Sequence, residues 1–381
     1  MKKVAVLGFG VIGTGVCKLL TESSSIAVLK YICDLRDIPG LPYGDKHIKD
    51  FNIVLNDPEI DAVIEVTGAK RAAYERSLEA IKAKKSVITS NKEVVAEYGV
   101  ELLQAARENG VSYLFEAAVG GAIPLIRTLR TSLDTDEITR ICGILNGTTN
   151  YILTKMKENG ETYDDALLDA QKLGYAEPDP SADVKGLDTC RKTSILSAFI
   201  DGGLIPPAEI DTTGIDNTPD CALTLAAALG GKIKLLGVAE KTPDGNGVSA
   251  KVAPCFIPEN NVLYAVDDVY NAVLIKCKNS GDVLLYGRGA GAIPTAAAIM
   301  SDINEALYGK TSELVWRRAE NKTAAGKKRK AFVITKGVPD GINEFRIIKE
   351  CTADKSHGYI IEDASGIEKL GSDIIAVYDV L

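Results

Sequence analysis

A glycine-rich turn near the start of the chain constrains the fold more than any other feature. The apolar run 4–7 has the pattern of a buried strand, the segment 8–13 is Gly-Phe-Gly-Val-Ile-Gly, and apolar residues at helical spacing follow. In this context Gly8 permits a tight turn, Gly10 lets the backbone approach a pyrophosphate, and Gly13 lets the helix pack closely on the strand. The N–H groups at the start of the helix can then bind phosphates. We predict a dinucleotide site with the candidate residues Gly8, Gly10, Val11, Ile12 and Gly13. The alternative is a structural turn in an α/β domain that binds no nucleotide.

Short apolar runs alternate with helical patterns along the first third of the chain. We expect strands at 4–7, 27–33, 61–66, 86–89 and 111–115, with helices at 71–83 and 94–109 among the connections. This alternation is typical of parallel strands joined by helical crossovers. The predicted fold class is therefore α/β, with a Rossmann-type doubly wound parallel sheet in this part of the chain.

Two residues that lie two positions apart, Asp34 and Arg36, allow either NAD or NADP as the nicotinamide cofactor. Asp34 follows the second expected strand, where a carboxylate can accept hydrogen bonds from the adenosine ribose of NAD. Arg36 can instead pair with the 2′-phosphate of NADP. The structural alternative for both residues is a solvated turn. Further candidate cofactor residues are Thr67 at a strand end, and Gly289 and Gly291 in a second glycine-rich turn that can equally be a packing turn.

The chain contains only two histidines, His47 and His357. A three-histidine metal centre and an HExxH zinc site are therefore excluded. If the chain is an enzyme, we expect lysine, aspartate, glutamate or tyrosine to carry its proton transfers.

The second half of the chain contains a candidate acid–base cluster. The loop 175–183 carries three carboxylates and two prolines and is expected to hold no helix, and a helix is expected at 187–200. Asp188 and Lys192 are four residues apart, so they share one face of this helix. The structural alternative is an ordinary surface ion pair. A lysine that faces several carboxylates can instead donate or accept a proton, with a pKa set by burial and by its neighbours.

Composition limits the partners and the compartment. There are 44 Lys and Arg residues against 52 Asp and Glu, which gives a formal net charge of −8 and argues against nucleic acid as a partner. The eight cysteines are scattered and form no CxxC motif, so we expect reduced thiols and a cytoplasmic location. No apolar run reaches the length of a membrane helix, so we expect no membrane partner.

Several segments together resemble the homoserine dehydrogenase family. They occur in the family's order over about residues 1–310, and the Asn-Gly-Thr-Thr-Asn and Glu-Pro-Asp-Pro segments are far more specific than the glycine turn. The matching segments are 8–13, Ser90-Asn91-Lys92-Glu93, 116–124, 143–151, 177–183, Gly186-Leu187-Asp188 with Lys192, and Gly289-Ala290-Gly291 with Thr295. The resemblance implies a homodimer that interconverts L-homoserine and L-aspartate 4-semialdehyde with NAD or NADP, on the route to threonine and methionine.

The same resemblance implies roles for individual residues. The expected catalytic residues are Lys192, Asp188 and Lys92, with Lys192 as general acid/base on the substrate oxygen and Lys92 also a cofactor contact. Hydride transfer to an aldehyde leaves an alkoxide, which a lysine ammonium can protonate and stabilise. Expected substrate contacts are Tyr175, Glu177, Asp183 and Asp188, with Glu177 at the amino group. A sodium or potassium ion is expected at the Glu116 carboxylate and the main-chain carbonyls of Val119, Gly121 and Ile123.

We expect a dinucleotide-binding domain at 1–130, an α+β substrate-binding and dimerisation domain at 131–290, and a helix at 291–310 that returns to the first domain. Within the second domain, Thr149 or Asn150 is the expected cap of a helix at 151–157. A β-rich extension of unknown role follows at 311–381. It lacks two good helices, so a regulatory βαββαβ ACT unit fits it poorly.

Two other functions remain open. One is another two-domain dinucleotide-dependent reductase of amino-acid metabolism, against which the intact segments 146–151 and 177–192 argue. The other is a non-enzymatic NAD(H)-binding sensor on the same fold. Such a sensor would need an effector or DNA-binding module, and the acidic charge balance argues against one.

Overall fold

The chain divides into two units, and each unit combines several segments. The computed structural model describes residues 1–381 except 24, 39, 41, 310–312, 323–328 and 354. Unit 1 comprises Met1–Ile138, Ser194–Pro207 and Gly287–Glu320. Unit 2 comprises Thr139–Thr193, Ala208–Tyr286 and Asn321–Leu381. Across the described ranges, none of the helices combines the length and apolar content that crossing a membrane requires.

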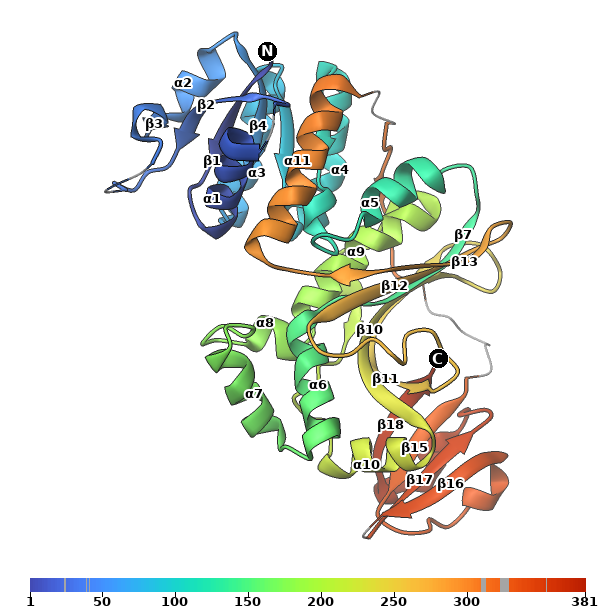
Figure 1. The fold of residues 1–381 in the computed structure, drawn as a ribbon. Helices are drawn as coiled ribbons and strands as arrows, with labels where there is room; N and C mark the ends of the chain where they lie inside the picture. Colours follow the sequence, from blue (N-terminus) through green and yellow to red (C-terminus); the bar gives the residue numbers. More distant parts are fainter. Residues whose placement is uncertain (24, 39, 41, 310–312, 323–328, 354) are drawn as a thin grey trace. The chain divides into compact units, whose positions relative to one another are not determined.

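Apolar runs near the start of the chain form the parallel sheet of unit 1 (Figure 1). Its strands are β1 (Lys3–Leu7), β2 (Val28–Cys33), β3 (His47–Ile48), β4 (Ile60–Glu65), β5 (Ser86–Thr89) and β6 (Tyr113–Leu114). The spatial order is β3-β2-β1-β4-β5-β6, with parallel pairing throughout. This strand order is that of a Rossmann-type fold and confirms the predicted fold class. The order reverses between β1 and β4, so a ligand crevice is expected beyond the carboxyl ends of these strands.

Helices cover both faces of this sheet, which explains why its strands are apolar on both sides. The helices of unit 1 are α1 (Val11–Lys18), α2 (Phe51–Asn56), α3 (Lys70–Lys82), α4 (Lys92–Asn109), α5 (Leu125–Arg127) and α11 (Ala292–Tyr308). Helices α1 and α11 lie on one face, and α3 and α4 lie on the other (Figure 1). Ile299 and Ile303 of α11 join Val6 and Ile64 of the sheet in one buried cluster.

Short elements complete unit 1. They are the helical turns η1 (Leu19–Ser23), η2 (Gly44–Lys46), η3 (Glu116–Ala118) and η4 (Thr128–Ser132), and a two-stranded parallel sheet of β8 (Gly203–Leu204) and β14 (Arg317–Arg318).

A mixed sheet forms the centre of unit 2. Its first strands are β7 (Ile138–Ile144), β9 (Asp211–Thr212), β10 (Gly231–Lys241), β11 (Val248–Pro258), β12 (Tyr270–Cys277) and β13 (Gly281–Arg288). The order β13-β12-β7-β10-β11 places β10 between two antiparallel neighbours, β7 and β11. The helical elements are α6 (Gly147–Asn159), α7 (Tyr163–Lys172), α8 (Ser181–Val184), α10 (Asp220–Ala228) and the turn η5 (Pro207–Glu209). Helix α9 (Leu187–Asp201) begins in unit 2, and its residues from Ser194 onward belong to unit 1. Gly237 of β10 meets Thr189 and Thr193 of α9, so α9 packs on one face of this sheet.

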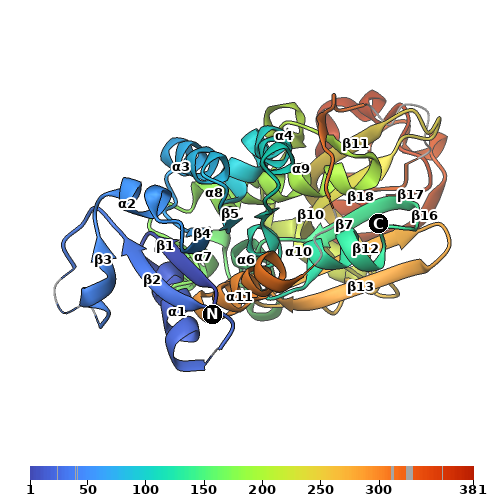
Figure 2. The ribbon, with the colours of Figure 1, turned by 90° about the horizontal axis from the view of Figure 1, so that it is seen from above.

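The C-terminal strands continue the same sheet (Figures 1 and 2). They are β15 (Ala331–Thr335), β16 (Ile347–Ala353), β17 (Ser356–Ile361) and β18 (Ile374–Val380), and β18 pairs in parallel with β11. The remaining order is β18-β15-β17-β16, with antiparallel pairing.

This order, fourth-first-third-second, is that of a βαββαβ unit. We expected the sequence of 311–381 to fit a βαββαβ unit poorly, and for the order of the four strands this expectation is wrong. At the helix positions the structure has the 3₁₀ turns η6 (Ile342–Glu344) and η7 (Ile367–Asp373), which explains why the sequence shows no helical pattern there.

Candidate functional site

The glycine turn of unit 1 has the geometry that a pyrophosphate requires. Gly8 has a positive φ of 92°, and a Cβ on Gly13 would lie 2.0 Å from the carbonyl oxygen of Gly8. A Cβ on Gly10 would meet nothing within 4 Å, so the backbone is open there. Helix α1 begins directly after Gly10 with Val11, which is exposed, and Ile12, which is half-buried. The turn and the first helical N–H groups therefore fit a dinucleotide phosphate.

Asp34 and Arg36 are bound to each other at the end of β2. Arg36 donates from Nε and Nη2 to the two carboxylate oxygens of Asp34, at 3.0 and 2.8 Å, and the N–H of Phe9 donates to the same carboxylate at 2.8 Å. The hydrogen bond from the Arg36 guanidinium holds the pKa of Asp34 well below its usual range. The Arg36 side chain is 65% exposed, and it also donates to the Phe9 carbonyl at 3.2 Å. A fixed cation thus lies beside the glycine turn.

A buried carboxylate links the ends of β4 and β5. Glu65 is fully buried and accepts the N–H and hydroxyl of Thr67, at 2.8 and 2.6 Å, and the hydroxyl of Thr89, at 2.9 Å. Thr89 Oγ1 accepts the N–H of Asn91 at 3.0 Å, and Asn91 caps α4, whose first residue is Lys92. Glu65 therefore connects the loops that carry two predicted cofactor residues, Thr67 and Lys92. Sequence reasoning missed Glu65, although an acidic residue at the end of an apolar strand was an available signal.

The loop predicted to hold a monovalent cation lies between η3 and α5. The two carboxylate oxygens of the buried Glu116 accept the N–H groups of Ile126 and Arg127, at 3.0 and 2.7 Å. Burial raises the pKa of Glu116. The other predicted ligands, Val119 and Ile123, are buried in the same loop. A buried carboxylate and the main-chain carbonyls of the loop that follows it are a donor set that suits a hard cation, so these residue types fit the group. In the described part of the chain, no three or more His, Cys, Asp or Glu side chains cluster in a way that could hold a metal ion.

The second glycine-rich turn packs against this loop. Gly121 has a φ of 55°, and a Cβ there would lie 2.6 Å from the carbonyl carbon of Gly289. The N–H of Ala122 donates to the carbonyl of Arg288 at 3.1 Å. Gly291 has a φ of 120° and precedes α11. These contacts give the turn a packing role, whereas its role toward a cofactor stays a prediction.

Lys192 lies in a buried polar cluster of unit 2 (the Lys192 cluster: Leu145, Asn146, Asp183, Asp188 and Lys192). Its Nζ donates to Asp188 Oδ2 at 2.8 Å and to the carbonyl of Leu145 at 2.6 Å. Lys192 and Asp188 are 8% and 5% exposed, so they are no surface ion pair. The side-chain nitrogen of Asn146 donates to Asp183 Oδ1 at 2.7 Å and to Asp188 Oδ2 at 2.9 Å. Burial and the charge of Asp188 raise the pKa of Asp183.

The junction of β7 and α6 explains where this cluster forms. Asn146 follows the buried strand directly and caps α6 by accepting the N–H of Thr149 at 2.8 Å. The prediction that Thr149 or Asn150 caps this helix is wrong, because the helix already begins at Gly147. Asn146 was not among the predicted site residues. An asparagine between a strand and a helix is a capping signal that could have found it.

Two predicted substrate contacts lie on the loop between α7 and α8. Tyr175 is 44% exposed, and its ring packs against that of Tyr151 with centroids 5.1 Å apart. Its carbonyl accepts the Thr148 hydroxyl at 2.7 Å. Glu177 is exposed, whereas Asp183 is half-buried. The expectation that this loop holds no helix is wrong, because the short helix α8 begins after the second proline and carries Asp183.

Comparisons with known proteins show which family the chain is similar to. Residues 8–116 match the family model described as "Homoserine dehydrogenase, NAD binding domain", and residues 124–303 match "Homoserine dehydrogenase". A homoserine dehydrogenase of Synechocystis sp. is 39% identical over 313 residues, which cover 79% of this chain and 72% of that protein.

Solved structures extend the likeness to the C-terminal strands. The crystal structure of a homoserine dehydrogenase from Thiobacillus denitrificans matches 100% of this chain and 98% of its own, with a TM-score of 0.87 and 29% identity. A hyperthermophilic archaeal homoserine dehydrogenase in complex with NADPH matches 82% of this chain and 100% of its own, with a TM-score of 0.71 and 30% identity. The resemblance seen in the sequence is thereby confirmed. The chain belongs to the homoserine dehydrogenase family, the NAD(P)-dependent oxidoreductases that act on the alcohol group of homoserine.

Proposed function

We propose that Lys192 moves the proton on the substrate oxygen while this chain interconverts L-homoserine and L-aspartate 4-semialdehyde, on the route to threonine and methionine. The observation that carries this proposal is the buried contact of Lys192 with Asp188 and with the carbonyl of Leu145. These contacts use two of the three N–H bonds of the ammonium. The remaining one suits a substrate oxygen.

A nicotinamide cofactor supplies or accepts the hydride at the substrate carbon when it is bound. In aldehyde reduction, the Lys192 ammonium stabilises the negative charge that develops on the oxygen and donates a proton to it. In alcohol oxidation, the neutral amine of Lys192 accepts the hydroxyl proton. Asp188 holds the lysine nitrogen in place from the preceding turn of α9. Lys92, the first residue of α4, is a second candidate for proton transfer.

The substrate carries an α-ammonium group, which needs acidic partners. We propose that Glu177, Asp183 and Asp188 provide them, with Glu177 at the amino group and Tyr175 beside it. The mixture of a buried and an exposed carboxylate supports this division, because Glu177 can reach a ligand that enters from solvent. The roles rest on the family resemblance together with the geometry of the Lys192 cluster.

A direct assay tests the function. Purified protein is mixed with L-homoserine and either NADP or NAD, and reduced nicotinamide is followed by its absorbance. We expect turnover with at least one cofactor. Absence of turnover with both, in sodium and in potassium buffers, would contradict the proposal.

We further propose that NADP is the preferred cofactor. Both carboxylate oxygens of Asp34 are bound to Arg36, which makes them poor acceptors for ribose hydroxyls. The exposed guanidinium of Arg36, fixed beside the glycine turn, suits a 2′-phosphate.

A sodium or potassium ion is proposed at Glu116 and the carbonyls of Val119, Gly121 and Ile123. The support is the burial of the Glu116 carboxylate, which a cation would offset. We expect the melting temperature to rise on adding sodium or potassium to protein in a tetramethylammonium buffer, and we expect Glu116→Gln to abolish the rise. An equal rise in both proteins would argue against the site.

A homodimer is proposed as the working state, with the second copy on the face of the unit 2 sheet that lies opposite α9. A groove of about 1320 Å³ lies along this face, and its lining includes Val238 and Glu240 of β10 and Lys251 of β11. The groove carries both positive and negative side chains, including Lys251 and Asp379, whose charged atoms lie 3.3 Å apart. A two-fold interface places the same surface on both copies, so a surface with both charge signs can pair with itself. Light scattering should give a dimer mass for the wild type and a monomer mass for Val238→Glu. A wild-type monomer would contradict the proposal.

We also propose a cytoplasmic location and the domain roles expected above: 1–130 with 291–310 for the cofactor, 131–290 for the substrate, and 311–381 as an extension. All eight cysteines lie in the described part of the chain, and none forms a disulfide, which supports a reducing compartment.

A further inference from the structure

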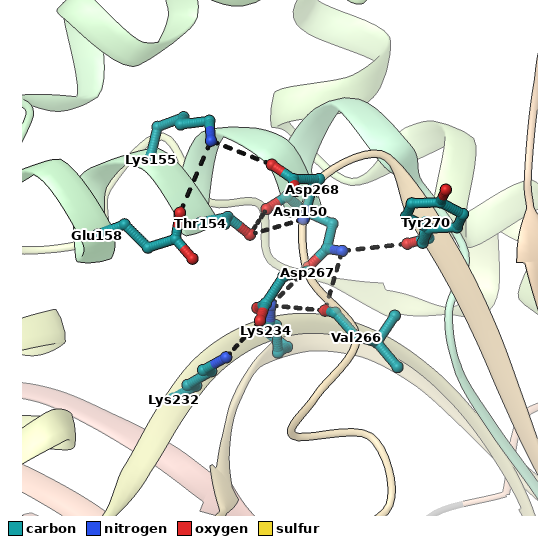
Figure 3. Close-up of polar contacts among 10 residues, drawn as sticks. All are labelled: Asn150, Thr154, Lys155, Glu158, Lys232, Lys234, Val266, Asp267, Asp268 and Tyr270. Atoms are coloured by element: carbon teal, nitrogen blue, oxygen red, sulfur yellow. Dashed lines mark hydrogen bonds and ion pairs between the residues drawn. The ribbon is translucent and has the colours of Figure 1, made fainter.

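A buried lysine on β10 holds helix α6 from a position outside the Lys192 cluster (Figure 3). Lys234 is only 1% exposed. Its Nζ donates to Asn150 Oδ1 at 2.9 Å, to the Val266 carbonyl at 2.8 Å and to Asp267 Oδ1 at 2.8 Å. These three acceptors match the three N–H bonds of an ammonium, so the group is fully hydrogen-bonded without water.

Asn150 transmits this contact to the helix. It is 1% exposed, and its side-chain nitrogen donates to the carbonyls of Val266 and Tyr270, each at 3.1 Å (Figure 3). The side-chain amide of an asparagine can flip and exchange its oxygen and nitrogen. Here the Lys234 ammonium needs an acceptor, so the Asn150 oxygen faces Lys234 and the nitrogen faces the loop that joins β11 to β12. The ammonium therefore fixes the orientation of the amide, and the amide fixes the start of α6 against that loop.

The Lys192 cluster begins one helical turn earlier. The N–H of Asn150 donates to the carbonyl of Asn146 at 3.3 Å, and Asn146 is the residue whose side chain binds Asp183 and Asp188. A displacement of the first turn of α6 would move these donors, because the turn is hydrogen-bonded as one piece. A misplacement of about 1 Å far from the reacting atoms can lower a rate by about 10²-fold.

We propose that Lys234 is a positioning residue for the Lys192 cluster, acting through Asn150 and the first turn of α6. The inference rests on the proposed role of that cluster in binding and proton transfer. The competing explanation is that Lys234 and Asp267 are only a buried ion pair of the fold. Apolar residues often replace such a pair without loss of stability, so stability alone does not call for an ammonium here.

Lys234→Met tests the proposal against a matched control, Lys85→Met. Lys85 is also buried, at 3% exposed, and donates to the carbonyls of Asp57 and Ile60, at 2.7 and 3.2 Å. It precedes β5 in unit 1, at the edge opposite the carboxyl ends of the strands. For Lys234→Met we expect kcat/KM for homoserine to fall roughly 10- to 100-fold, with an unchanged Kd for NADPH measured by fluorescence. For Lys85→Met we expect a similar loss of melting temperature with kcat/KM within about twofold. A Lys234→Met protein that keeps kcat/KM within about twofold at a temperature where it is folded would overturn the proposal.

Two further variants keep the test decisive if Lys234→Met does not fold. Asp267→Asn leaves the contact of Lys234 with Asn150 in place, so we expect kcat/KM within about twofold of wild type. Asn150→Ala removes the contact, so we expect the roughly 10- to 100-fold loss. If Asp267→Asn and Asn150→Ala have the same kcat/KM for homoserine, the proposal is overturned.

A readout that needs no turnover separates this inference from the proposed function. Amide hydrogen exchange at 147–150 should become faster in Asn150→Ala and in Lys234→Met, but not in Lys85→Met. Inactivity of the wild type would count against the proposed function alone. Unchanged exchange at 147–150 would count against the positioning role, whatever the activity.

Discussion

The ammonium of Lys192 lies 2.8 Å from the carboxylate of Asp188, and both side chains are almost completely buried on the same helix. A buried ion pair is costly unless additional hydrogen bonds satisfy it. Here Leu145 and Asn146 provide those bonds from the junction of β7 and α6. The pair is therefore held in one geometry, which is what a proton-transfer site needs.

Lys192→Ala should lower kcat for homoserine oxidation by roughly 10²–10⁴-fold, because the proton on the substrate oxygen loses its acceptor. The Kd for NADPH should stay the same, since the glycine turn belongs to unit 1. Steady-state kinetics and a fluorescence titration provide the two readouts. Lys185→Ala, at an exposed lysine, is the control and should have wild-type kinetics. Near-normal kcat in Lys192→Ala would exclude the proposed role.

Arg36→Ala should lower kcat/KM for NADP by roughly 10- to 100-fold, because a charged hydrogen bond to the 2′-phosphate contributes about 1.5–3 kcal/mol. The kcat/KM for NAD should stay constant or rise, because without Arg36 the Asp34 carboxylate is released to accept hydrogen bonds from a ribose. Kinetics with both cofactors measure the ratio. Lys49→Ala, another exposed cation in this region, controls for a general loss of positive charge. A parallel loss for both cofactors would argue against a phosphate contact.

Glu65→Gln should weaken NADPH binding by about tenfold, because the new amide NH₂ donates where the carboxylate accepted. The Thr89 hydroxyl, whose oxygen accepts the N–H of Asn91, then loses the acceptor for its own O–H. The loops that carry Thr67 and Lys92 then lose their common anchor. Thr89→Val should weaken binding in the same direction, whereas Thr89→Ser, which keeps the hydroxyl, should bind as the wild type does. Tight binding in Glu65→Gln would show that the bridge has no bearing on the cofactor.

The stability of the fold should depend on pH through Lys234. The pKa of Lys234 is lowered from 10.5 to about 8, mainly by burial and also by the charge of Lys232, while the hydrogen bond that Lys234 donates to Asp267 opposes the shift. Between these two values the unfolded chain binds a proton that the folded chain has released, so the free energy of unfolding rises with pH in this window. The stability of the wild type relative to Lys234→Met should therefore increase from about pH 7.5 to about pH 10. Urea unfolding at both pH values measures it, and a constant difference would contradict the low pKa.

Local patterns in the sequence predict much of the fold. The bounds expected for the strand at 86–89 agree with those of β5, because its β-branched residues stand between polar residues at both ends. The glycine turn and the shared face of Asp188 and Lys192 also follow from spacing alone. Short strands such as β8 and β9 have no such pattern, because pairing with distant segments creates them.

The polar contacts of the site depend on residues far apart in the chain, and spacing cannot predict them. Asn146 and Asp188 are 42 positions apart, and Lys234 and Asn150 are 84 positions apart. Each pair meets only after the sheet and helices have packed. The strand order at the C-terminal end could not be predicted either, because the connections that define a βαββαβ unit are here only 3₁₀ turns.

The place of α11 has a consequence for how the chain can fold during synthesis. Its apolar side chains cover the same sheet face as α1, yet the helix is made long after β6 has left the ribosome. Until residues 292–308 emerge, Val6, Ile64 and their neighbours lack part of their cover, and the nascent sheet exposes an apolar surface. We therefore expect the first segment of unit 1 to need protection from aggregation while the rest of the chain is translated. A fragment that stops at residue 138 should aggregate rather than fold as a free cofactor-binding domain.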